Sequence, residues 1–190
     1  LVAMLLASAR PLAVITLPSQ QQTLVLAMDV SGSMRATDVK PNRLVAAQEA
    51  AKSFITELPR HVRVGIVAFA GSAQVTQLPT VNREDLTTAI DSFQLQRGTA
   101  TGSGLIVALA TRFPDAGIDI SQLIYGRPAQ SESNAPIGQA KKPKEDFVPV
   151  APGSNHSAAI ILLTDGQRTT GPDAVDAAKM AAERGIRVYT

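Results

Sequence analysis

TLVLAMDVSGSM, residues 23–34, changes from apolar to polar at its midpoint. Leu24–Met28 is a continuous apolar run, which is typical of a strand buried on both faces of a parallel sheet. The polar half then places a carboxylate, Asp29, before two hydroxyls, Ser31 and Ser33. A carboxylate at the end of a buried strand is costly unless another group compensates its charge. An all-oxygen set of this kind favours magnesium, calcium or manganese as that group.

The composition indicates one aliphatic domain. The chain has 190 residues, enough for a single domain with a sizeable core. Hydrophobic residues make up 45% but aromatic residues only 4%, so the core is expected to consist of Leu, Val, Ile and Ala. The net charge of +2 is too small to predict nucleic-acid binding. The absence of cysteine excludes disulfides and thiolate chemistry but leaves the compartment undecided.

Apolar spacing in the rest of the chain predicts helices that alternate with strands. A short edge strand is expected to form a hairpin with the strand before it. This order predicts an α/β fold, with a doubly wound, mostly parallel sheet and helices on both faces. The expected strands are residues 23–28, 62–69, 73–78, 158–163 and 186–190. The first expected helix starts at Asp38, with Pro41 near its first turn, and the second starts at Asn82. The third is expected to start at Leu105, after a small-residue loop over 97–104, and the fourth at Pro172.

The regions outside these elements predict the domain organisation. Residues 1–9 are apolar and would rise about 14 Å as a helix, roughly half a bilayer core. We interpret them as the end of a membrane helix, with a merely buried apolar segment as the alternative. Residues 10–22 are expected to form a linker, and 23–190 the domain, with its C-terminal part incomplete. The proline-rich stretch at about 114–157 is expected to be a surface insertion.

A second apolar run also ends in a carboxylate. The strand expected at 158–163 is followed by Thr164-Asp165-Gly166. In doubly wound sheets, binding sites form outside the carboxyl ends of the strands, where the strand order reverses. If the two strands are neighbours, the loops that carry Asp29 and Asp165 face each other.

These motifs together resemble the von Willebrand factor A (vWA) domain family. Asp29-x-Ser31-x-Ser33 is similar to the DxSxS signature of that family, Gly98-Thr99 stands where the family places its metal-site threonine, and Asp165 matches its second aspartate. The resemblance implies a metal-ion-dependent adhesion site and the strand order 3-2-1-4-5, with the third strand antiparallel at the edge. Its expected metal ligands are Asp29, Ser31, Ser33, Thr99 and Asp165, with Thr101 as the rival for the third hydroxyl and Asp38 as a candidate for a second ion.

The resemblance also implies a mode of binding and a setting. Mg²⁺, with Mn²⁺ and Ca²⁺ as alternatives, is expected to bind a glutamate or aspartate carboxylate of a partner protein. The apolar start, the linker, DxSxS and DVKPNRL at residues 38–44 resemble bacterial membrane-anchored vWA proteins of the aerotolerance-operon type. A domain tethered to the bacterial inner (cell) membrane, on the periplasmic or external side, is therefore expected.

Two other function classes compete with this interpretation. A phosphatase of the haloacid-dehalogenase type would need Asp-x-Asp, and Ser31 replaces the second carboxylate here. We therefore expect no catalytic residues and no small-molecule substrate. A vWA scaffold that binds no metal is the other alternative, although all five ligand positions are filled. His61 and His156 stand apart from these motifs and are expected to be ordinary surface residues.

Overall fold

The computed structural model describes residues 22–114, 118–126, 148–166 and 168–190. The expected membrane-helix end, all but the last residue of the linker, and the central part of the insertion lie outside these ranges. No helix within them has the length and apolar character needed to cross a membrane.

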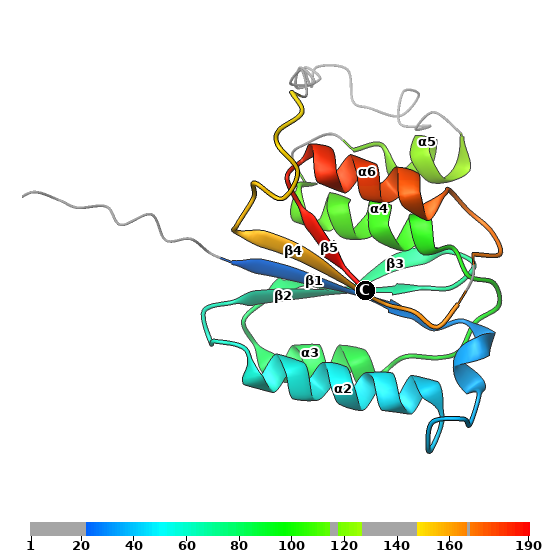
Figure 1. The fold of residues 1–190 in the computed structure, drawn as a ribbon. Helices are drawn as coiled ribbons and strands as arrows, with labels where there is room; N and C mark the ends of the chain where they lie inside the picture. The colour runs from blue at the N-terminus through cyan, green and yellow to red at the C-terminus, as the bar shows by residue number, and fades with distance from the viewer. Residues whose placement is uncertain (1–21, 115–117, 127–147, 167) are drawn as a thin grey trace, which may run out of the picture.

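A five-stranded sheet forms the centre of the domain (Figure 1). Its strand order is β3-β2-β1-β4-β5, and β1 pairs in parallel with both β2 and β4. β5 is parallel to β4, whereas β3 runs antiparallel to β2 at one edge. The predicted doubly wound sheet, its strand order and its antiparallel edge are thereby confirmed. The strands are β1 (Thr23–Asp29), β2 (Arg63–Phe69), β3 (Ala73–Thr80), β4 (Ala158–Leu163) and β5 (Arg187–Tyr189).

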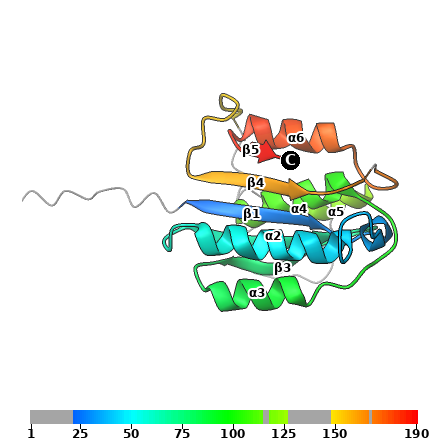
Figure 2. The same cartoon turned by 60° about the horizontal axis from the view of Figure 1, so that its bottom comes forward.

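Helices cover both faces of the sheet, as expected for this fold. Helices α2 (Arg43–Glu57) and α3 (Arg83–Asp91) lie on one face, and α4 (Thr101–Arg112) and α6 (Ala174–Glu183) lie on the other (Figure 1). Figure 2 brings the first of these faces forward and shows α2 and α3 side by side, aligned with the strands. A short 3₁₀ helix, η1 (Gly32–Arg35), follows β1, and α5 (Ile120–Tyr125) lies within the region predicted as an insertion.

The alternation of side chains along β1 explains its continuous apolar sequence. Val25 and Ala27 pack into the core formed with α4 and α6, while Leu26 and Met28 pack into the core formed with α2 and α3. All four side chains are at most 1% exposed. Because helices cover both faces of the sheet, neither set of alternating positions on β1 faces water.

Two predicted helix starts were wrong. Helix α2 begins at Arg43 rather than near Asp38, because Asn42 is its N-cap and accepts a hydrogen bond from the Val45 amide at 2.9 Å. Pro41 directly precedes this N-cap, so it lies near the first turn, as predicted.

Helix α4 begins at Thr101 rather than Leu105, so half of the predicted small-residue loop is helical. A Cβ at Gly102 would lie 2.4 Å from the Pro172 carbonyl oxygen, and one at Gly104 would lie 2.7 Å from the Phe69 ring. These glycines allow close packing of the helix and do not mark a loop.

Candidate metal centre

The two predicted aspartates lie at the same edge of the sheet. Asp29 is the last residue of β1, and Asp165 follows the end of the neighbouring strand β4 by two residues. In the parallel register of these strands, Met28 is paired with Leu163. The condition set by the sequence, that these two strands be neighbours, is therefore met, and the two loops face each other.

A chain of hydrogen bonds joins the serines to the second aspartate. The Ser31 and Ser33 hydroxyl oxygens are 2.9 Å apart, and the Ser33 hydroxyl donates to Asp165 Oδ1 at 2.8 Å. The segment differs from the extended turn that the sequence predicted, since only Ser31 is extended and Ser33 lies in η1. The tight 3₁₀ turn still brings both hydroxyls to one side.

Asp29 is a buried carboxylate held by neutral donors. It is 1% exposed, and it accepts hydrogen bonds from the Ser31 amide at 2.8 Å and from the Thr164 hydroxyl at 2.7 Å. Among the residues that the structure describes, no lysine, arginine or histidine forms an ion pair with Asp29. Its negative charge is thus buried without a cation from this part of the chain.

Thr99 completes the group from the loop before α4. Its side chain is buried, and its backbone is fixed by Thr169, which accepts from the Thr99 amide at 2.8 Å and donates its own amide to the Thr99 carbonyl at 2.9 Å. A Cβ built on Gly166 would have three nearest neighbours: Ser33 Oγ at 3.7 Å, Asp29 Oδ2 at 3.9 Å and Thr99 Cγ2 at 3.9 Å. An oxygen of Asp29, the hydroxyl of Ser33 and the methyl group of Thr99 therefore lie around one point beside Gly166. The rival, Thr101, is buried two residues further on, as the first residue of α4, and stays the alternative source of the third hydroxyl.

Sequence reasoning missed Arg43, the first residue of α2. Its guanidinium donates to both oxygens of Asp38, from Nε at 2.8 Å and Nη2 at 2.7 Å, and its Nη1 donates to Asp165 Oδ2. The hydrogen bonds with Asp38 and Asp165 raise the pKa of Arg43 above its ordinary value, and the Arg43 hydrogen bond holds the pKa of Asp38 below its own. Asp38 thus binds Arg43 and does not cap α2, whose N-cap is Asn42.

The donor set fits a hard divalent ion. Within the described ranges, no three His, Cys, Asp or Glu side chains gather as a metal-binding cluster, so the candidate site depends on two carboxylates and on hydroxyls. Mg²⁺ keeps several waters and needs few carboxylates, which suits such a set. Asp29, Ser31 and Thr99 are buried, whereas Ser33 is exposed, so the group opens to solvent on the Ser33 side.

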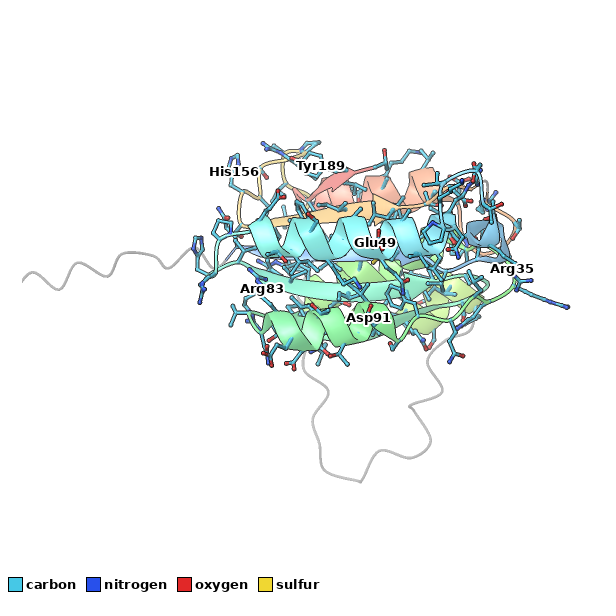
Figure 3. The ribbon with its side chains drawn as sticks, turned by 90° about the horizontal axis from the view of Figure 1, so that it is seen from below. Arg35, Glu49, Arg83, Asp91, His156 and Tyr189 are labelled. Atoms are coloured by element: carbon cyan, nitrogen blue, oxygen red, sulfur yellow. The ribbon has the colours of Figure 1, made fainter. Side chains whose placement is uncertain are left out.

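A hollow of about 310 Å³ adjoins this group. Met34, Val39, Ala46, Ala47 and Leu163 form its apolar wall, and Arg43, Thr164 and Asp165 its polar rim. Figure 3 shows Arg35 of η1 extending away from this end of the domain, with His156 at the opposite end. His156 and His61 are both exposed.

Comparisons with known proteins agree with this fold. Residues 24–167 match the model of the von Willebrand factor type A domain. A UPF0353 protein of Mycolicibacterium gilvum is 37% identical over 196 residues, which cover 100% of this chain and 50% of the relative. The chain therefore spans about half the length of such relatives.

Two solved structures are also similar. The conserved hypothetical protein BatB of Bacteroides thetaiotaomicron is 29% identical with a TM-score of 0.57, over 88% of this chain and 64% of that one. An aerotolerance-related membrane protein of Bacteroides fragilis is 25% identical with a TM-score of 0.58, over 88% of this chain and 65% of that one.

Proposed function

This chain belongs to the von Willebrand factor type A domain family, and from that premise we propose that it is a protein-interaction module that binds an acidic residue of a partner through a divalent metal ion. The observation that carries the proposal is the state of Asp29. Its carboxylate is 1% exposed, and its partners among the described residues are an amide and a hydroxyl. A buried carboxylate of this kind is stabilised most simply by a cation, and the oxygen atoms around it are those that Mg²⁺, Mn²⁺ or Ca²⁺ prefers.

Each residue of the group has a distinct role in this proposal. Ser31, Ser33 and Thr99 supply neutral hydroxyl ligands, while Asp29 and Asp165 supply the negative charge, directly or through water. Mg²⁺ held by mostly neutral ligands would supply an electrophilic centre for an anionic oxygen from outside. A partner would approach from the exposed Ser33 side. The aspartate or glutamate carboxylate is the commonest such oxygen on a protein surface.

The setting is the second part of the proposal. The similar protein of Bacteroides fragilis is described as an aerotolerance-related membrane protein, and residues 1–9 of this chain are apolar. We propose that the domain is tethered to the cell membrane of a bacterium, on its periplasmic or external side, and that it acts by binding and not by catalysis.

Titration calorimetry with Mg²⁺, Mn²⁺ and Ca²⁺ tests the metal site. We expect saturable binding by the wild-type domain. The Ser31→Ala/Ser33→Ala double variant loses two direct ligands, and since indirect ligand partners alone cost about 10- to 100-fold in affinity, we expect Mg²⁺ binding to weaken by more than about 100-fold. Ser53→Ala, an exposed serine on α2, is the matched control and should bind as the wild type does. Absence of binding by the wild type favours a scaffold that needs no metal.

Selection of peptides from a random library, in Mg²⁺ and separately in EDTA, tests the partner chemistry. The peptides recovered in Mg²⁺ should share an aspartate or glutamate, and replacing that residue by its amide should abolish binding. Recovery of the same peptides in EDTA would count against the proposal. A phosphatase assay covers the enzyme alternative: Mg²⁺-dependent turnover that is lost in Asp29→Asn would favour catalysis.

A further inference from the structure

Arg43 contacts the candidate metal centre from outside the predicted ligand set. We infer that Arg43 is a resident cation on Asp165 and sets how tightly the site binds a divalent metal ion. This inference rests on the proposed function, because it concerns the same site. Nothing in the DxSxS pattern, the Gly-Thr loop or the TDG segment includes this residue.

The first step of the argument is that both oxygens of Asp165 have partners. Oδ1 accepts from the Ser33 hydroxyl at 2.8 Å, and Oδ2 accepts from Arg43 Nη1. The Asp165 side chain is 13% exposed although the residue as a whole lies at the surface, so its carboxylate is only partly shielded from water. A metal ion that uses Asp165 must therefore share this carboxylate with the guanidinium or displace it. Two cations that share one carboxylate each weaken the other's interaction with it.

The second step is that Arg43 is held in place. Asp38 binds its Nε and Nη2 through both carboxylate oxygens, which leaves Nη1 for Asp165. This two-oxygen contact uses the planar fork of arginine, which a lysine cannot reproduce. Arg43 is also the first residue of α2, whose start is fixed by the Asn42 cap. The position of this cation is thus set by the fold.

The third step is that the contact can separate at low cost. The hollow of about 310 Å³ has both Arg43 and Asp165 on its rim. The Arg43 side chain is 33% exposed and that of Asp38 is 54% exposed, so the two can shift together toward solvent and keep their own contact while Nη1 leaves Asp165. Metal binding and the Arg43–Asp165 contact are therefore coupled, and by linkage each weakens the other to the same extent.

Calorimetry with Mg²⁺ on three variants tests this inference. Arg43→Gln removes the resident cation, and we expect about tenfold tighter Mg²⁺ binding, within the range of about 5- to 150-fold typical of coupled sites. Arg43→Lys keeps the charge but loses the fork, and we expect about threefold tighter binding. Arg168→Gln is the matched control, because Arg168 carries the same charge on the loop after β4 but pairs with Asp173. Its Mg²⁺ affinity should stay within about twofold of the wild type.

Thermal unfolding gives a second measurement on the same proteins. In EDTA, Arg43→Gln leaves Asp165 without its cation, so its melting temperature should lie below that of the wild type. In saturating Mg²⁺ the difference should narrow. A purely structural role for Arg43 predicts the same difference under both conditions.

The outcomes separate this inference from the proposed function. If the wild type binds Mg²⁺ and both Arg43 variants bind it with the same affinity, the inferred role of Arg43 is wrong, while the proposed metal site is still supported. If Arg43→Gln does not fold, the Mg²⁺ affinity of Arg43→Lys alone tests the inference. Binding that appears only in Arg43→Gln supports the inference strongly. Absence of Mg²⁺ binding in the wild type and in every variant overturns both proposals.

Discussion

Replacing Asp29 with asparagine removes one negative charge from the interior and leaves the side chain almost unchanged in shape. Asp29 is 1% exposed and accepts from the Ser31 amide and the Thr164 hydroxyl. An asparagine can keep both contacts, because its carbonyl oxygen can accept from the amide and its NH₂ group can donate to the hydroxyl. The substitution therefore tests the charge of Asp29 separately from its hydrogen bonds.

Two opposing terms determine the stability of this variant without metal. Hydrogen bonds to a charged group contribute about 1.5–3 kcal/mol and those between neutral groups about 0.5–1.5 kcal/mol, so the two contacts together lose about 2–3 kcal/mol. Removing a buried charge without a cation saves several kcal/mol of desolvation. We therefore expect Asp29→Asn in EDTA to unfold with a free energy that is within about 1 kcal/mol of the wild type, or higher.

In Mg²⁺, the wild type should become more stable than Asp29→Asn. At about 100 times its Kd, an ion that binds only the folded state adds about 2.7 kcal/mol to the free energy of unfolding. For a domain of this size, this corresponds to an increase of about 5–10 °C in melting temperature. The wild type should show this gain and Asp29→Asn should not. Urea unfolding followed by circular dichroism, in EDTA and in excess Mg²⁺, measures the free energy of unfolding, and thermal unfolding under the same conditions measures the melting temperature.

Two results would refute this reasoning. If Asp29→Asn is less stable by several kcal/mol in EDTA, Asp29 is a structural carboxylate whose charge the loop amides require. If the variant keeps the Mg²⁺ gain, the charge of Asp29 is not needed for metal binding. Asp91→Asn is the matched control, because Asp91 lies at the surface and pairs with Lys52. Asp91→Asn should show the same increase in the free energy of unfolding on addition of Mg²⁺ as the wild type.

Two further expectations follow from the packing and from the Asp38–Arg43 pair. Gly104→Ala places a Cβ 2.7 Å from the Phe69 ring, so the free energy of unfolding measured in urea should fall by about 1–3 kcal/mol. The control Ser53→Ala should leave this free energy within about 0.5 kcal/mol of the wild type. An unchanged free energy in Gly104→Ala would show that α4 can shift away from the sheet. Arg43 lowers the pKa of Asp38 below its ordinary value of 3.8, so this contribution to stability is present above that pH and disappears as the pH falls through the lower pKa of the folded state. Urea unfolding of Asp38→Asn against pH in EDTA should therefore show a shallower acid decline than the wild type, and parallel profiles would contradict the contact.

The convergence of the two aspartates could be predicted because it depends on simple properties of strands. Leu24–Met28 and Ala158–Leu163 are apolar throughout, which indicates strands with helices on both faces. The carboxyl ends of parallel strands share one edge of a sheet. Asp29 and Asp165 stand at or just after these ends, so only the adjacency of the strands remained to be established.

Other features could not be predicted because their cause lies far away in the sequence. Gly102 and Gly104 suggested a loop, but the groups that exclude a side chain there are Pro172 and Phe69, which reach α4 only through the tertiary fold. Arg43 contacts Asp165 across 122 residues. The only local signal for Arg43 was the acidic residue five positions before it, Asp38. A pattern built on ligand types does not include such a cation.

The three loops of the candidate site are also bonded to one another. The Ser33 hydroxyl joins the loop after β1 to Asp165 in the loop after β4. Thr169 in that same loop holds the amide and the carbonyl of Thr99. The Gln96 amide, in the loop that leads to Thr99, donates to the Val30 carbonyl at 2.8 Å. This bond joins the loop before α4 to the loop after β1, so each of the three loops is bonded to the other two.

Each loop is therefore held by the other two, and the oxygen atoms are placed by the fold itself. A site assembled in this way loses little conformational entropy when it binds, so more of its interaction energy remains as affinity. Arg43 acts against this advantage, because it lies on the one carboxylate of the group that is not deeply buried. In the proposed site the fold would supply an ordered set of oxygen ligands together with a cation, Arg43, that weakens metal binding, and the Arg43 variants measure that effect.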